Sequence, residues 1–89
     1  MKIKVKTNFG INGVAGEGIQ FEENPSLRDV LFNLSGRAEF PLIYPDGQID
    51  PDVEITLNGL EYAFLPGRLD TELKEDDSLE IMMLALGGG

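Results

Sequence analysis

The segment "LDTELKEDDSLEIMML" (residues 69–84) carries the clearest structural pattern in the chain. Its final part places Leu79, Ile81 and Met83 at every second position, which is the spacing of a β-strand that buries one face. The charged run "KEDDS" before this strand predicts a turn. Upstream of the turn, two leucines spaced four residues apart are expected to anchor a short helical or turn segment on the core.

A β-hairpin is predicted directly upstream. In "VEITLNGLEYAF" (residues 53–64), Asn58 and Gly59 separate two stretches of alternating apolar and polar residues. Both residues tolerate positive φ, which the centre of a tight two-residue hairpin turn requires. We therefore expect strands at residues 53–57 and 60–64, the second of them short.

The N-terminal part of the chain predicts two more strands, joined by a glycine-rich connection. The stretch "KIKVKT" (residues 2–7) alternates lysines with apolar or β-branched residues, so one face should be covered and the other solvated. The stretch "IQFEE" (residues 19–23) alternates through Ile19 and Phe21. We expect these two strands to pair. The lysines on the solvated face are Lys2, Lys4 and Lys6.

The pattern changes to a helical period in "NPSLRDVLFNLSGR" (residues 24–37). Ser26 precedes Asp29 by three residues, as in a capping box with Asp in the Glu position. The sequence predicts a helix of about ten residues, with Gly36 in a left-handed conformation just past its end. The apolar positions at i, i+3, i+4 and i+7 are Leu27, Val30, Leu31 and Leu34.

Residues 38–52 break the regular pattern, because Pro41, Pro45, "PDGQ" and "DPD" are turn formers placed around an apolar group. We expect an irregular crossover that packs on the core. The element order predicts an α+β fold in which a four- to five-stranded sheet packs on one main helix. It predicts one domain at residues 1–84, and the glycine-rich residues 85–89 follow it as an expected flexible C-terminal tail, which the resemblance described below implies.

The composition excludes several classes of function. The 89 residues contain no cysteine and no histidine, which removes disulfides, thiol nucleophiles and Cys/His metal sites. Seven Lys plus Arg against sixteen Asp plus Glu give a formal net charge of -9, and such a surface repels nucleic acid. No apolar run approaches the roughly 18–20 residues that span a bilayer, and the N-terminus does not follow the pattern of a secretion signal. We expect a cytoplasmic protein without nucleic-acid or membrane partners.

Together these features resemble the β-grasp sulfur-carrier and ubiquitin-like family, especially the small subunit of molybdopterin synthase and archaeal ubiquitin-like modifiers. The resemblance covers nearly the whole chain. It rests on the helix "SLRDVLFNL", the hairpin "VEITLNGLEY", the closing segment quoted above and the terminal glycines. It implies a mixed sheet with the closing strand at its centre, from which the chain leaves as a mobile tail. Asp76 stands where a glycine of the family would relax the closing turn.

The resemblance also implies chemistry at the C-terminus, with no catalytic residue, bound cofactor or metal in this chain. An E1-like enzyme would use ATP to convert the carboxylate of Gly89, a poor electrophile, into an acyl-adenylate that sulfur or an amine attacks. Gly88 would permit close approach because it has no Cβ. Six extended residues reach at most about 20 Å, far enough to enter another protein's site. The remaining tail and docking residues are Gly87, Leu86, Leu84 and Met82.

Three functions stay open at this point. The first is a sulfur carrier of the molybdopterin type, whose partner would be the large subunit of the synthase. Residues 36–52 favour it, because carriers of the thiamine pathway tend to lack such a segment. The second is a modifier joined to lysines of target proteins, and the third is an interaction module that is never activated. The functional terminus would be Gly89, or Gly88 if the last glycine is extra or trimmed.

Strand alternation leaves a choice at the base of the tail. If the buried residues of the closing strand face the helix, Met82 and Leu84 lie on the opposite face and form a docking patch, for which methionine is well suited. Alternatively, residues 38–52 fold over both side chains. The acidic "KEDD" turn (residues 74–77) would steer the molecule toward a basic partner.

Overall fold

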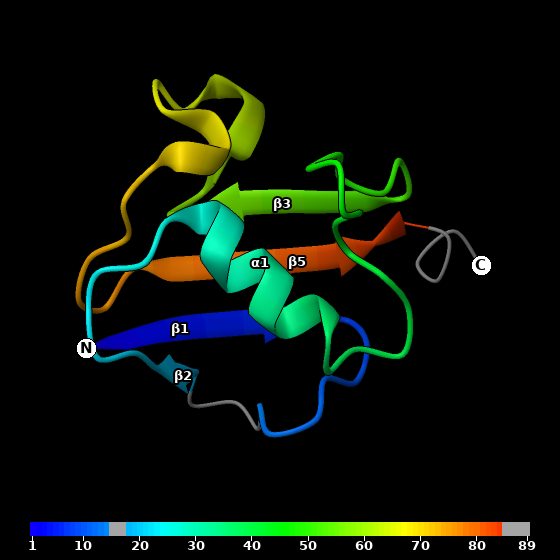
Figure 1. The fold of residues 1–89 in the computed structure, drawn as a ribbon, viewed down its shortest axis with the longest axis horizontal. Helices are drawn as coiled ribbons and strands as arrows, with labels where there is room; N and C mark the ends of the chain where they lie inside the picture. Colours follow the sequence, from blue (N-terminus) through cyan, green and yellow to red (C-terminus); the bar gives the residue numbers. More distant parts are fainter. Residues whose placement is uncertain (15–17, 85–89) are drawn as a thin grey trace.

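The computed structural model describes residues 1–14 and 18–84. Within them lie five strands, one α-helix and two short 3-10 helices (Figure 1). In chain order these elements are β1 (Lys2–Thr7), β2 (Ile19–Gln20), α1 (Leu27–Ser35), β3 (Val53–Leu57), β4 (Leu60–Glu61), η1 (Tyr62–Phe64), η2 (Arg68–Asp70) and β5 (Ser78–Met83).

The five strands form one mixed sheet in the order β2-β1-β5-β3-β4. The last strand, β5, lies in the centre, parallel to β1 and antiparallel to β3. Figure 1 shows α1 packed across one face of this sheet. The predicted mixed sheet with a central closing strand is therefore confirmed.

The core lies between the helix and the inner face of the sheet. All four apolar residues at the helical spacing are fully buried, and alternate residues of β1, β3 and β5 meet them. Leu73 is also fully buried, whereas Leu69 is only partly buried against the core. Apolar burial of this kind stabilises a domain by roughly 25 cal/mol per Å² removed from water. The buried sheet residues are Ile3, Val5, Ile19, Val53, Ile55, Leu57, Leu79, Ile81 and Met83.

The predicted capping box begins α1. The side chain of Ser26 accepts a hydrogen bond from the Asp29 N–H (3.1 Å), and the Asp29 carboxylate accepts one from the Ser26 N–H (3.3 Å). The other end differs from the prediction, because Gly36 is right-handed (φ -69°). The last turn tightens instead, and the Arg37 N–H donates to the Leu34 carbonyl (3.0 Å). This bond satisfies a carbonyl at the helix end without a left-handed residue.

The two edge strands are shorter than predicted, for different reasons. Gln20 pairs with Lys2 and the Phe21 N–H reaches the carbonyl of Met1, so residues 22–23 have no part of β1 left to pair with. After Glu61 the chain turns into η1. A 3-10 helix places residues i and i+3 on the same side. Tyr62 and Leu65 thereby both pack on the core, which an alternating strand does not allow.

The turns match the sequence signals. Asn58 (φ 52°) and Gly59 (φ 88°) are both left-handed, as a two-residue hairpin turn requires. Asp76 is also left-handed (φ 67°), which is the conformation that a glycine would adopt without strain. Gly18 is needed for a different reason, since a Cβ there would lie 2.0 Å from the carbonyl oxygen of Ile3.

The crossover at residues 38–52 is irregular, as predicted, and it contributes to the core. Leu42 and Ile43 are buried, and the ring of Phe40 packs against Phe9 with centroids 5.1 Å apart. The Leu42 N–H donates to the Ser35 hydroxyl (2.9 Å), which fixes the crossover to the end of α1. Among the residues described, no helix has both the length and the apolar character needed to cross a membrane.

Candidate functional site

The end of β5, where the predicted tail begins, is held from both sides. The Asn8 side chain accepts a hydrogen bond from the Met83 N–H (2.8 Å) and donates one to the Met83 carbonyl (3.0 Å). On the other side, the Leu84 N–H donates to the carbonyl of Asp52 (2.7 Å). The amide of Asn8 thus continues the pairing of β5 beyond the end of β1. We call the two hydrogen bonds between Asn8 and Met83 the Asn8–Met83 pair.

Sequence reasoning did not single out Asn8. It follows β1 directly, and its partner lies 75 positions away. The pairing depends on the register of β1 against β5, in which Thr7 lies opposite Ile81. A polar residue just after a strand is also common in ordinary turns, so the residue type carries no separate signal.

The predicted site residues divide into two groups. Leu86, Gly87, Gly88 and Gly89 lie outside the described residues, and their roles stay predictions. Met82 and Leu84 are described: Met82 is partly exposed, and 49% of Leu84 is exposed. Of the apolar residues in segment 38–52, Leu42 and Ile43 are buried in the core, and Pro51 lines a hollow together with Leu84. Docking at Met82 and Leu84 remains a prediction.

A small hollow of about 230 Å³ adjoins Leu84. It opens where β4 stops, because β4 pairs only with Thr56 and Leu57 of β3. Its walls are mainly apolar, and Glu54 and Glu61 supply two carboxylates. The hollow therefore combines the exposed side chain of Leu84 with the negative charge of two carboxylates. The lining residues are Pro51, Val53, Glu54, Ile55, Glu61, Tyr62, Ala63 and Leu84.

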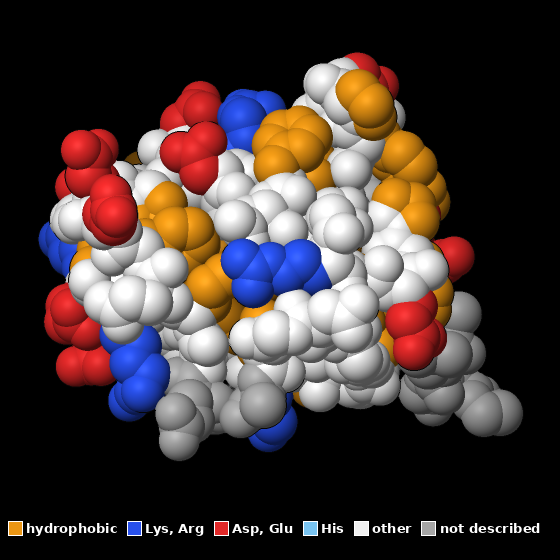
Figure 2. Space-filling model, turned by 60° about the horizontal axis from the view of Figure 1, so that its bottom comes forward, with side chains coloured by type: hydrophobic (Ala, Val, Ile, Leu, Met, Phe, Trp, Pro, Cys, Tyr) orange, Lys and Arg blue, Asp and Glu red, His pale blue; other side chains and the backbone are white. Residues whose placement is uncertain are grey.

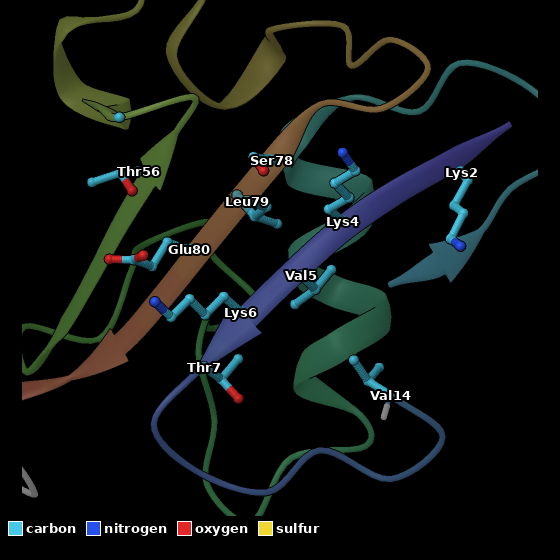
Figure 3. Close-up of a pocket in the computed structure, with 11 residues that line it drawn as sticks. Lys2, Lys4, Val5, Lys6, Thr7, Val14, Thr56, Ser78, Leu79 and Glu80 are labelled. Carbon is cyan, nitrogen blue, oxygen red and sulfur yellow. The ribbon is translucent and has the colours of Figure 1, made fainter. Parts of the chain in front are cut away.

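A larger, open depression of about 750 Å³ lies on the outer face of the sheet, away from α1. Lys2, Lys4 and Lys6 of β1 line it, and β5 adds Ser78 and Glu80 (Figure 3). The register explains the arrangement, since Lys4 lies opposite Ser78 and Lys6 opposite Glu80. We call the three lysines the β1 lysine row.

On the face of the molecule shown in Figure 2, the acidic groups are distributed unevenly. Figure 2 shows most of the visible carboxylates at the left-hand end, where the closing turn lies in Figure 1. Among the described residues, the one ion pair within 4.0 Å joins Arg28 and Asp70, 3.2 Å apart, and it is exposed. Because the chain has a formal net charge of -9, the β1 lysine row is a basic strip on an acidic molecule.

One hydrogen bond on the crossover shifts the titration of both its partners. The Tyr44 hydroxyl donates to the Asp50 carboxylate (2.5 Å). This bond lowers the pKa of Asp50 and raises the pKa of Tyr44, because it favours the charged carboxylate and the protonated phenol. Both groups are at the surface, far along the chain from the tail, and they fix the turn at residues 44–50.

Comparison with known proteins identifies the fold. No family model matches the sequence, and no curated protein matches it either. Among solved structures, the crystal structure of SAMP1 from Haloferax volcanii superposes with a TM-score of 0.61. The two share 18% identity over 91% of this chain and 92% of that one. The chain therefore has the β-grasp, ubiquitin-like fold, with its mixed sheet of five strands packed on one helix.

Proposed function

We propose that this chain is a carrier protein whose terminal glycine is activated by an E1-like enzyme and then charged with sulfur. The observation that carries the proposal is the position of the glycines: they follow within a few residues of β5, the central strand of a β-grasp sheet. The Asn8–Met83 pair and the bond from Leu84 to Asp52 hold the point where the tail begins. A fixed origin limits where the end of a short tail can reach.

The proposed chemistry takes place in two steps on the partner enzyme. The carboxylate of Gly89 attacks the α-phosphorus of ATP, and pyrophosphate leaves to give an acyl-adenylate. A hydrosulfide ion then attacks the acyl carbon, and AMP leaves to give a thiocarboxylate. Gly88 permits close approach to the nucleotide because it lacks a Cβ. ATP belongs to the partner, and this chain supplies the carboxylate.

Within this class, we favour a carrier of the molybdopterin type. The segment at residues 36–52 supports this choice, because carriers of the thiamine type tend to be shorter and to lack such a segment. Here the segment adds Leu42 and Ile43 to the core. The partner in sulfur transfer would be the large subunit of molybdopterin synthase. A protein modifier is the second candidate, because the same acyl-adenylate can pass its glycine to a lysine of a target protein.

Intact-mass measurement tests activation directly. The chain is incubated with ATP, Mg²⁺, the E1-like enzyme of its host and a sulfur donor, beside a known carrier as positive control. We expect exchange of one terminal oxygen for sulfur, localised to Gly89. A matched variant with one phenylalanine added after Gly89 should not react. An unchanged mass in both chains, with the control modified, would leave a β-grasp interaction module that is not activated.

The docking patch at the base of the tail has its own test. Met82 lies opposite Glu54 across the β5–β3 pair, so a glutamate at position 82 would add like-charge repulsion within the sheet. Met82→Gln and Leu84→Ser avoid this effect. We expect both variants to bind the activating enzyme more weakly while their melting temperatures stay close to that of the parent. Unchanged binding of the double variant would remove the patch from the proposal.

A further inference from the structure

We propose that the β1 lysine row binds an extended acidic segment of a partner protein, with carboxylates at alternate positions. This interaction goes beyond the activation of Gly89 and does not depend on it. The row lies on one solvent-facing side of β1, where Lys4 and Lys6 are exposed and the intervening Val5 is buried. It lines an open depression of about 750 Å³ on the face of the sheet that α1 does not cover (Figure 3).

The spacing of the row defines the form of the ligand. Successive lysines are two residues apart on a strand, so their Cα atoms are separated by roughly 6.6 Å. An extended peptide has the same repeat, because its alternate side chains also point to one side. A segment with Glu or Asp at every second position can therefore place one carboxylate beside each ammonium group in register. A run of consecutive acidic residues would point half of its carboxylates away from the row.

Charge complementarity favours an acidic occupant at this place although the chain as a whole is acidic. Three of the seven Lys and Arg residues are in the row, and the row makes no ion pair within 4.0 Å among the described residues. Like charges that lie side by side on a strand repel one another, so a ligand with carboxylates at the same spacing relieves that repulsion. The hydroxyl groups of Ser78 and Thr56 line the same depression and can donate further hydrogen bonds.

The positions of the surrounding carboxylates predict which lysine contributes most to binding of the acidic segment. Lys6 lies opposite Glu80, and the Lys2 N–H is bonded to the Glu75 carboxylate (3.0 Å). Lys4 lies opposite the uncharged Ser78. The positive charge of Lys4 is therefore the least compensated by nearby carboxylates among the three lysines. Glu80 lies within the depression beside Lys6, and Glu54 and Glu61 lie further across the sheet on β3 and β4. These carboxylates restrict an acidic ligand to the β1 side of the face.

Titration of the whole ¹⁵N-labelled chain with two synthetic peptides tests this site. The first peptide alternates Glu with Thr, and the second has the same composition with all Glu residues in one block. We expect saturable amide shifts centred on β1 and Ser78 with the alternating peptide, about threefold weaker binding of the block peptide, and loss of binding as salt screens the charges. Equal binding of the two peptides, or shifts centred on another surface, would overturn the proposal.

Variants that are expected to change the affinity in opposite directions make the test independent of folding defects. Lys4→Gln should weaken binding about fivefold and Lys6→Gln about twofold, whereas Glu80→Gln should strengthen it about twofold. Lys74→Gln and Glu39→Gln are the matched controls outside the row, both at exposed positions, and we expect them to leave the affinity unchanged. Absence of saturable shifts at millimolar peptide, or no response to Lys4→Gln and Glu80→Gln, refutes the assignment. Tighter binding of a thymidine oligonucleotide of equal charge would assign the face to nucleic acid instead.

Discussion

Replacing Asn8 by alanine should loosen the end of β5 and destabilise the whole domain. The substitution removes two hydrogen bonds, of 2.8 and 3.0 Å, to the backbone of Met83. Each such bond contributes about 1 kcal/mol net, and a partly buried backbone group left without a partner adds to the loss. We therefore expect Asn8→Ala to lower the free energy of unfolding by about 2 kcal/mol. For a domain of this size, that corresponds to a fall in melting temperature of roughly 8–16 °C.

Urea unfolding and native-state hydrogen exchange measure the two parts of this effect. The Met83 amide should exchange faster in Asn8→Ala than the global loss of stability explains, while the central residue Ile81 should follow the global change alone. Asn33→Ala is a matched control, because Asn33 is exposed on α1 and its change should stay within about 0.5 kcal/mol. A loss below about 0.5 kcal/mol in Asn8→Ala, with Met83 protection unchanged, would refute the assigned role.

Three further predictions concern turns and caps. Asp76→Gly should raise the unfolding free energy by about 0.5–1 kcal/mol, because φ at this position is 67°, and an unchanged urea midpoint would contradict the claim of strain. Ser26→Ala should cost about 1 kcal/mol through loss of the bond to the Asp29 N–H, measured by the same method. Tyr44→Phe should lower the melting temperature at pH 7, and this difference should shrink as the pH falls below the ordinary pKa of an aspartate, because the Tyr44 bond lowers the pKa of Asp50 and so stabilises the fold while this carboxylate is charged. A difference in melting temperature that persists with Asp50 protonated would refute it.

Much of the fold follows from local patterns. The period of two at Leu79, Ile81 and Met83, the Asn58-Gly59 turn and the capping box at Ser26 each specify an element within about ten residues of chain. The structure has the elements at these places, and β1 and β3 have the predicted boundaries. These signals succeed because hydrogen bonding within a turn or helix and the burial of alternate residues both depend on near neighbours.

The two strands whose lengths were predicted wrongly depend on pairing partners and on contacts with the core. The strand predicted at residues 19–23 ends at Gln20 because β1 has no residues left to pair with it. The strand predicted at residues 60–64 gives way to η1, in which Tyr62 and Leu65 both reach the core. Strand propensity was present at both places, but pairing partners and core contacts set the length.

The sequence alone specified the elements, the acidic surface, the alternation that exposes the lysines of β1 and the glycines after the last strand. Tertiary structure was needed to place β1 parallel to β5 in the register that puts Lys4 beside Ser78, Lys6 beside Glu80 and Asn8 beside Met83. Residues more than 70 positions apart meet in that register. It is selected by the packing of the inner face on α1, because a slip of one residue would turn every buried side chain of β5 toward solvent.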